Sequence, residues 1–239
     1  MKLTLEQIMN NSFVVTIDNE RFAAFEKGLS EANIPKELFP RKYTGYEITD
    51  DYLLSHFRFL KEQAESVYHG LAELNISLVH ALCNNASHVG IVQLAKFTNM
   101  PFVTIFEDDA TPVENCIEKL NKQCENIPDN TDVLRLGYIY THTPRVANYI
   151  GAANVIDDNL IQGWFAGSHA YIVFSKYYDR FIEENKLCPR CDFGKINPGE
   201  DKVVYDLKES VFRQCNIEGR PVIHSWKFAN GQIKLPTVG

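Results

Sequence analysis

The sequence predicts an α/β protein with an open, mostly parallel sheet and helices on both faces. Residues 13–17 form a short β-branched run, and apolar residues at helical spacing follow it. This strand-then-helix order is typical of an α/β unit. Residues 102–106 are almost wholly apolar, which is typical of a central strand covered on both faces. The length of 239 residues and the 45% apolar content suit one globular domain.

The first unit predicts a strand over 13–17 and a helix that ends before Pro35. Asp18 or Asn19 is placed to cap this helix, because short polar side chains accept hydrogen bonds from the first-turn amides. The apolar positions recur at i, i+3, i+7 and i+10: Phe22, Phe25, Leu29 and Ala32.

The middle of the chain predicts two helices, a strand and a further helix. The helices are expected over about 51–74 and 84–98, and the strand over 102–106. After the strand, Thr111 at N-cap, Pro112 at N1 and Glu114 at N3 form a capping-box pattern. We therefore expect a helix over 112–125.

The remaining chain predicts strands over 132–137 and 170–175 and a helix over 176–185. Residues 138–168 lack helical period, and 187–201 predict a loop. We expect a single domain over 1–239.

Charge and composition exclude several classes of protein. The net charge of −7 argues against a nucleic-acid surface, because polyanions are held by clustered cations. No apolar run approaches the roughly 20 residues that span a bilayer. The first residues have an early acid and no long apolar core, so we expect no secretory signal and a cytoplasmic protein.

The cysteines predict neither a disulfide framework nor a zinc site. Six cysteines without a secretory signal favour reduced thiols. Cys188 and Cys191 have metal-knuckle spacing, but no second pair at matched spacing accompanies them. We expect them to be two thiols in a loop.

The main chemical signal is an acidic turn of Glu107, Asp108 and Asp109 directly after the apolar strand. The carboxyl ends of strands form the usual ligand edge of an open α/β sheet. Three adjacent carboxylates repel one another unless a cation is present, and hard oxygen ligands select Mg²⁺ or Mn²⁺. The ordinary alternative is a solvated turn stabilised by the dipole of a helix over 112–125.

Several phosphate-handling and hydrolytic motifs are absent from the sequence. It contains no G-x-x-x-x-G-K-[ST] loop, no G-x-G-x-x-G after the first strand, no G-x-S-x-G and no H-E-x-x-H. A phosphatase of the D-x-D-x-T type would need aspartate at Glu107, because the longer side chain misplaces the phosphoryl acceptor. A metal-dependent phosphohydrolase is therefore a second, weaker interpretation.

Ser87 and His88 lie one helix before the apolar strand that ends in Glu-Asp-Asp at 107–109. This pattern resembles glycosyltransferase family 25, the sugar transferases of lipopolysaccharide and lipooligosaccharide assembly. Weaker landmarks follow in the family's order at 17–21, 132–137, 167–173 and 198–201. Together they cover about residues 12–207. The resemblance implies a nucleotide-sugar-binding half at 12–137 and an acceptor half with the C-terminal tail at 138–239.

The resemblance implies a GT-A, Rossmann-like fold, a nucleotide-sugar donor such as a UDP-sugar, and Mn²⁺ or Mg²⁺. Asp109 is the first choice for metal ligand and Glu107 the second. Asp108 or Glu107 would otherwise contact ribose or sugar hydroxyls. A metal ion would neutralise the charge of the departing nucleoside diphosphate.

Other residues have candidate roles beside ordinary structural ones. Arg21 could pair with a phosphate or lie on the surface. Ser87 and His88 would lie near the donor, or be a capping serine and a buried histidine. His224 is a possible metal ligand, although a lone histidine is more often structural.

The acceptor half has its own candidates. Glu200 and Asp201 are the candidates for a general base that takes the acceptor proton in an inverting transfer. Asp201 fits the family's turn better, but it could also cap a helix starting near Lys202. Trp164 could stack on an acceptor sugar or belong to the core.

The resemblance leads us to expect hexose transfer to a saccharide or glycolipid acceptor in cell-surface glycan assembly. The protein would be free in the cytoplasm or docked at the inner membrane face. Besides the phosphohydrolase, a non-catalytic module that binds sugar or nucleotide remains a third interpretation.

Overall fold

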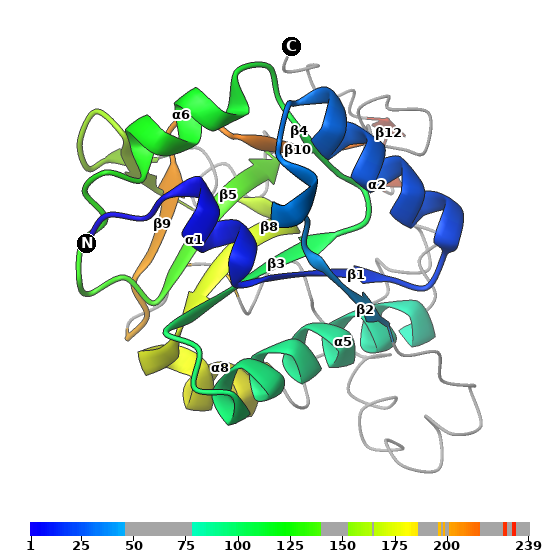
Figure 1. Ribbon diagram of the computed structural model, residues 1–239. Helices are drawn as coiled ribbons and strands as arrows, with labels where there is room; N and C mark the ends of the chain where they lie inside the picture. Colours follow the sequence, from blue (N-terminus) through cyan, green and yellow to red (C-terminus); the bar gives the residue numbers. More distant parts are fainter. Residues whose placement is uncertain are drawn as a thin grey trace.

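The computed structural model describes residues 1–45, 78–139, 153–163, 165–185, 196, 198, 201–215, 227–228 and 231–232. In this part of the chain a large mixed sheet lies between two layers of helices (Figure 1). The predicted α/β class is confirmed, and the arrangement is compatible with a Rossmann-like fold.

The described helices are α1 (Leu5–Asn10), α2 (Asn19–Glu31), η1 (Lys36–Leu38), α5 (Leu78–Phe97), α6 (Cys116–Gln123), η2 (Ser175–Tyr177) and α8 (Tyr178–Asn185). Two of the described helices, α2 and α5, are long, with 13 and 20 residues, and the others are short.

Eight of the described strands form the main sheet, in the order β2-β1-β3-β8-β5-β9-β7-β6. They are β1 (Ser12–Thr16), β2 (Arg41–Thr44), β3 (Phe102–Glu107), β5 (Val133–Ile139), β6 (Asn154–Val155), β7 (Leu160–Gln162), β8 (Ala166–Phe174) and β9 (Val204–Leu207). Two small antiparallel pairs are not part of the main sheet. They are β4 (Ala110–Pro112) with β10 (Phe212–Gln214), and β11 (Lys227–Phe228) with β12 (Gly231–Gln232).

The sheet is mixed because β8 and β7 run against the other strands. β1 is parallel to β2 and β3, and β5 is parallel to β9, whereas β8 pairs antiparallel with both β3 and β5. Since β8 lies between β3 and β5, the two predicted halves of the chain interleave within one sheet.

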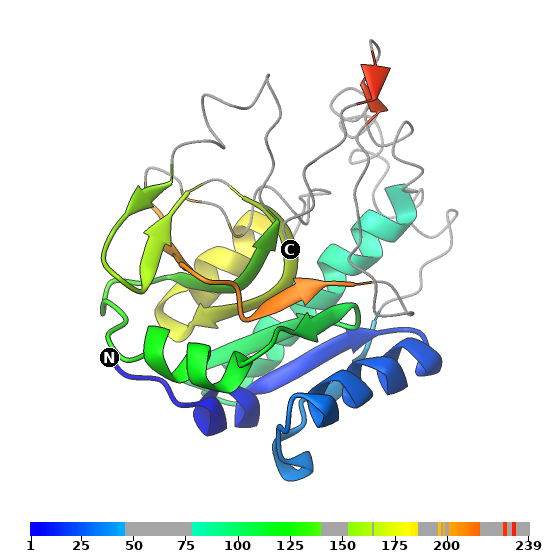
Figure 2. The ribbon, with the colours of Figure 1, turned by 90° about the horizontal axis from the view of Figure 1, so that it is seen from above.

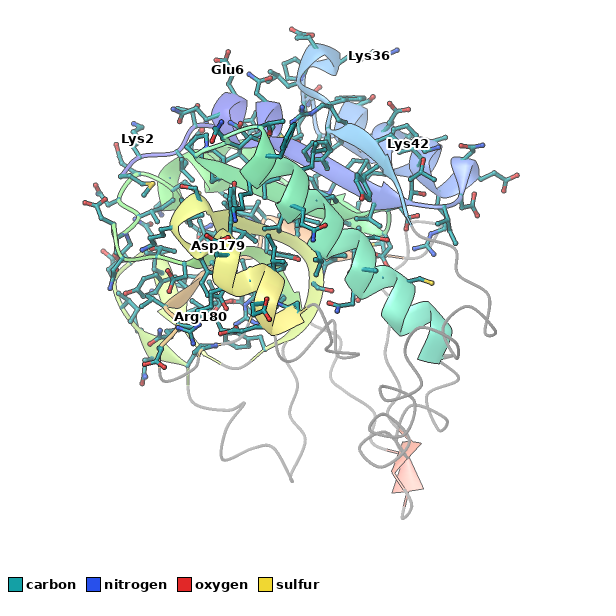
Figure 3. All side chains as sticks on the ribbon, turned by 90° about the horizontal axis from the view of Figure 1, so that it is seen from below. Lys2, Glu6, Lys36, Lys42, Asp179 and Arg180 are labelled. Atoms are coloured by element: carbon teal, nitrogen blue, oxygen red, sulfur yellow. The ribbon has the colours of Figure 1, made fainter. Side chains whose placement is uncertain are left out.

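Alternation along β3 divides the core into two layers. Val103 and Ile105 pack toward α5 and α8, where Val92 is also fully buried. Phe102 and Phe106 pack on the opposite face, against α1, α2 and α6. The predicted covering of both faces is therefore confirmed, and Figure 3 shows the α5 and α8 layer from below, with Asp179 and Arg180 on α8.

Most predicted elements of the first unit and the sheet are present. Asp18 caps α2, with its carboxylate accepting from the amides of Glu20 and Arg21. Helix α5 begins six residues before the expected 84–98 helix, and β8 begins four residues before the expected strand. The helix expected over 51–74 lies outside the described residues.

The capping-box prediction at 111–114 is wrong. Ala110–Pro112 is strand β4, and α6 begins only at Cys116. Asn115, the residue before α6, has a left-handed φ of 57° and makes no side-chain cap. Pairing with β10, more than 90 residues later in the chain, competes successfully with the local helix signal.

None of the helices in the described part of the chain is long and apolar enough to cross a membrane.

Candidate functional site

The acidic turn lies at the carboxyl edge of the sheet, where three strands meet. β1 and β3 run parallel, with Val15 opposite Glu107, so their last residues share this edge. β8 starts here because it runs the other way, and its Ala170 lies opposite Phe106. The turn therefore lies beside the end of β1 and the beginning of β8.

Glu107 points toward α5 and accepts hydrogen bonds from two sides. Its Oε1 accepts from Asn84 Nδ2 at 3.2 Å on α5 and from Ser168 Oγ at 2.6 Å on β8. His88 Nε2 lies 3.3 Å from the same oxygen. The side chain of Glu107 is only 15% exposed.

A buried histidine and a buried tyrosine lie on the interior side of Glu107. His88 is fully buried, its Nδ1 lies 2.7 Å from the hydroxyl of Tyr171, and the two rings stack 5.7 Å apart. Burial alone would raise the pKa of Glu107. The hydrogen bond and charge of His88, with the donors on Ser168 and Asn84, outweigh it and hold that pKa well below its usual range. Glu107 is therefore an internal carboxylate that ties the turn to α5 and β8.

Asp108 points to the β1 and α2 side of the turn. Its Oδ1 lies 2.5 Å from Arg21 Nη2, and the carboxylate is 9% exposed. Arg21 is in the first turn of α2, placed there by the Asp18 cap. Burial raises the pKa of Asp108, and a hydrogen bond from Thr16 and the charge of Arg21 only partly oppose that shift.

Asp109 is held from a third direction, by β10. Its Oδ2 accepts from Gln214 Nε2 at 2.8 Å, and its backbone carbonyl accepts from the amide of Cys215 at 2.8 Å. Arg21 Nη2 is 3.6 Å from Oδ2. Among the residues that the structure describes, Oδ1 of Asp109 is buried and has no hydrogen-bond partner.

The surroundings of Asp109 disfavour its negative charge. Burial, followed by repulsion from Glu107, raises the pKa of Asp109 to about 7, although the hydrogen bond from Gln214 opposes the shift. A buried carboxylate oxygen without a partner is costly, and a cation would relieve that cost.

The turn is also not the first turn of a helix. Because α6 begins at Cys116, its amide groups are not available to neutralise Glu107, Asp108 or Asp109. The alternative of a helix-capping acidic turn is therefore wrong.

A divalent cation fits this turn only as a partly protein-bound ion. In the described ranges, no three His, Cys, Asp or Glu side chains converge to form a metal cage. Mg²⁺ and Mn²⁺ often use one or two carboxylates, with waters and substrate phosphates supplying the remaining oxygens. Asp109 Oδ1 fits such a role, with Asp108 beside it. Glu107 does not, because its Oε1 already contacts Asn84, Ser168 and His88.

The structure brings most of the predicted donor-side residues together. Arg21, His88, Glu107, Asp108 and Asp109 lie in one contiguous cluster.

Ser87 contributes to this region differently from the prediction. It is buried, and its hydroxyl donates to the carbonyl of Cys83 at 2.7 Å, which is an internal bond of α5.

Asp201 is not brought to this cluster. It lies three residues before β9, whose Val204 pairs with Val133 at the start of β5. This is the amino edge of β3 and β5, and at about 3.3 Å per residue the six residues of β3 separate the two edges by roughly 20 Å. The side chain of Asp201 is 82% exposed, and its carbonyl accepts from Arg180 at 2.5 Å.

Three other predicted candidates, Trp164, Glu200 and His224, lie outside the described residues, as do the two loop cysteines Cys188 and Cys191.

Sequence reasoning missed four residues that shape the cluster. Asn84 precedes His88 by one helical turn, so the two side chains lie on the same face of the helix. This spacing could have identified Asn84 from the sequence. Tyr171 lies in the strand expected over 170–175, whereas Ser168 lies in the part of β8 that precedes it. The contacts of both depend on which strand lies beside β3. Gln214 had no local signal.

Comparison with protein-family models finds no match for this chain, and comparison with curated proteins finds none either.

Proposed function

We propose that this protein is a glycosyltransferase of the family 25, GT-A type. It would move a hexose from a nucleotide-sugar donor, a UDP-sugar, to a saccharide or glycolipid acceptor of cell-surface glycan assembly. The donor would bind at the acidic turn with Mn²⁺ or Mg²⁺. The family is proposed from the motif resemblance, and the geometry of the cluster supports a donor site at the acidic turn.

The observation that carries the proposal is the state of Asp109. Its Oδ1 is a buried carboxylate oxygen without a partner in the described structure, at the carboxyl end of a central strand. Such an edge is where open α/β sheets bind ligands. When bound, a divalent cation would neutralise the negative charge that develops on the departing diphosphate.

In the proposed site, different residues would hold the cation, face a donor phosphate and keep the turn in place. Asp109, with Asp108 beside it, would hold the cation. Arg21 is 41% exposed and lies within reach of both aspartates, so its guanidinium can also face a donor phosphate. Glu107 and His88 would keep the turn in place from the interior.

The partners of Glu107 argue against the phosphohydrolase. That mechanism needs a nucleophile at the first position of the acidic turn. The Oε1 of Glu107 accepts from Asn84 and Ser168 and faces His88, so this carboxylate is engaged in the interior.

The position of Asp201 favours a second candidate, a binding module without transferase activity. Asp201 lies at the other edge of the sheet, so we do not propose it as the group that takes the acceptor proton. A base at the donor edge would have to come from elsewhere in the chain.

A titration of UDP with and without Mn²⁺ tests the proposal, combined with separate assays for UDP and phosphate release. We expect Mn²⁺-dependent UDP binding in the wild type and its loss in Asp109→Asn, which removes the anionic ligand and keeps the shape. Exposed Glu114→Gln is the matched control. Binding without UDP release from any UDP-sugar would favour the module, phosphate release from simple esters would favour the hydrolase, and unaltered binding in Asp109→Asn would exclude the site.

A further inference from the structure

We infer that Gln214 is a positioning residue that orients the Asp109 carboxylate so that Oδ1 faces the bound cation. This inference rests on the proposed metal site and names a residue far from it in the sequence. Gln214 lies in β10, 105 residues after Asp109.

The β4 and β10 pair brings Gln214 to the turn. Gln214 lies opposite Ala110, the residue directly after Asp109, and the pair continues to Phe212 opposite Pro112. Figure 2 shows the orange strand β10 alongside the green β4. The next residue, Cys215, donates its amide to the carbonyl of Asp109 at 2.8 Å. Consecutive residues of one segment therefore hold both the main chain and the side chain of Asp109.

The hydrogen bond makes the two oxygens of Asp109 different. Oδ2 accepts from Gln214 at 2.8 Å and lies 3.6 Å from Arg21, whereas Oδ1 is buried without a partner in the described structure. A carboxylate free to rotate about its last bond would average the two positions. The bond to Gln214 fixes one oxygen, and so fixes where the other lies.

The chemical type of Gln214 suits this role. A glutamine amide donates a hydrogen bond without a positive charge, so it holds Asp109 without competing electrostatically with a cation. A lysine or arginine at this position would attract both oxygens and repel the metal. Groups that orient metal ligands in this way commonly contribute 10- to 100-fold to metal affinity.

The close fit of β10 against β5 keeps Gln214 in place. A Cβ on Gly137 would fall far inside van der Waals contact with the carbonyl oxygen of Phe212 and with His169 Nε2. Glycine at 137 therefore lets β10 lie directly on β5. The amide of Val211 also donates to the carbonyl of Leu136 at 2.8 Å.

Binding of Mn²⁺ alone, followed by the EPR signal of the free ion, tests the inference in the full chain. Gln214→Met keeps the length of the side chain and removes the amide donor. We expect its Mn²⁺ dissociation constant to rise about 10-fold. Gln162→Met is the matched control, because Gln162 also lies in a strand, is half-buried, and donates to a protein oxygen, the carbonyl of Val204.

Each outcome supports or overturns a defined statement. Weaker binding in Gln214→Met, with wild-type affinity in Gln162→Met, supports the inference. If the wild type binds Mn²⁺ and Gln214→Met binds equally well, the inference fails and the proposed metal site survives. If both variants weaken equally, the effect is general and the inference fails. If the wild type binds no Mn²⁺, the metal site and the inference fall together. Gln214→Asn, which keeps the amide on a shorter side chain, serves if Gln214→Met does not fold, and we expect an intermediate loss.

Discussion

Glu107, Asp108 and Asp109 follow one another in the chain but have three different sets of partners. Glu107 accepts from α5 and β8, Asp108 faces Arg21 on α2, and Asp109 accepts from β10. Three adjacent acids are tolerated in a small space because each is directed toward a different element. Only Asp109 retains a buried oxygen without a partner in the described structure.

The raised pKa of Asp109 predicts a stability change with pH in the metal-free protein. Its pKa of about 7 exceeds the model-compound value of 3.8, so the folded state binds this proton more tightly than the unfolded state does. The resulting stabilisation is complete below about pH 4 and is lost as pH rises through about 7. Asp109→Asn should therefore be more stable than the wild type at pH 8, by about 1–3 kcal/mol, and similar to it at pH 4.

Urea unfolding at pH 4 and pH 8 in the presence of a chelator measures this difference. Glu114→Gln, an exposed acid beyond the turn, should show no such gain. A variant Asp109→Asn that is less stable than the wild type at pH 8 would contradict the buried, repelled carboxylate.

Arg135 and Asp206 form a second buried ionic feature, which is structural. Both are fully buried, Arg135 Nε donates to Asp206 Oδ1, and Nη2 donates to Oδ2 at 3.0 Å. Arg135 also donates to the carbonyls of Phe165 at 2.9 Å and Gly163 at 2.8 Å. One guanidinium therefore joins β5 and β9 to the segment before β8.

Removing one partner of this pair should be strongly destabilising. Asp206→Asn leaves a buried cation without its anion, and we expect a loss of about 3–5 kcal/mol in the free energy of unfolding. Adding Arg135→Met removes that unpaired charge, so the double variant should recover part of the loss. Urea unfolding of both variants measures this, and a double variant less stable than Asp206→Asn would refute the argument.

At the scale of elements, the important feature is the strand that replaces a predicted helix. Thr111, Pro112 and Glu114 have the residue types of a helix start, yet 110–112 pairs with β10. This pairing brings Gln214 and the amide of Cys215 to Asp109. A helix starting at Pro112 would have left the turn without these contacts.

Gly137→Ala should detach β10 from β5. The added methyl group would overlap the carbonyl of Phe212 and the ring of His169, at a cost of about 1–3 kcal/mol. We expect faster hydrogen exchange at the amides of Val211 and Cys215, which bond to Leu136 and Asp109. Exchange at the amide of Thr104, which bonds to Asn11 at the far side of β3, should stay unchanged. Unchanged exchange at the amide of Val211 would show that the packing of β10 on β5 does not depend on glycine at position 137.

At the scale of the whole molecule, the sheet separates two polar regions. The acidic turn lies at the carboxyl edge of β3, and the amino edge carries a network of Lys202, Glu184 and Arg180 around Tyr177. Asp201 belongs to the second region, since its carbonyl accepts from Arg180. The two regions lie at opposite ends of the strands, so the length of β3 separates them.

Asp201→Asn should therefore change little. The substituted side chain is 82% exposed, and the contact from Arg180 at 2.5 Å is to the main chain, which the variant retains. We expect the free energy of unfolding to change by less than about 0.5 kcal/mol, and UDP binding and release to stay at wild-type levels. A fall in turnover of about 10²–10⁴, typical of losing a general base, would restore Asp201 to the site.

The sequence by itself determined the features that depend on neighbouring residues. The apolar run at 102–106 predicted a buried central strand, and Asp18 was predicted among the caps of the first helix. The acidic turn was predicted at the end of that strand, because strand polarity and apolar pattern are local properties.

The tertiary structure alone decided which residues complete the turn. β8 lies between β3 and β5, which brings Ser168 to Glu107 and places Tyr171 under His88. β10 pairs with β4, which overrides the capping pattern and brings in Gln214, and β9 carries Asp201 to the far edge. Each of these outcomes depends on strand order, a property of long-range pairing that side-chain periodicity within a segment does not encode.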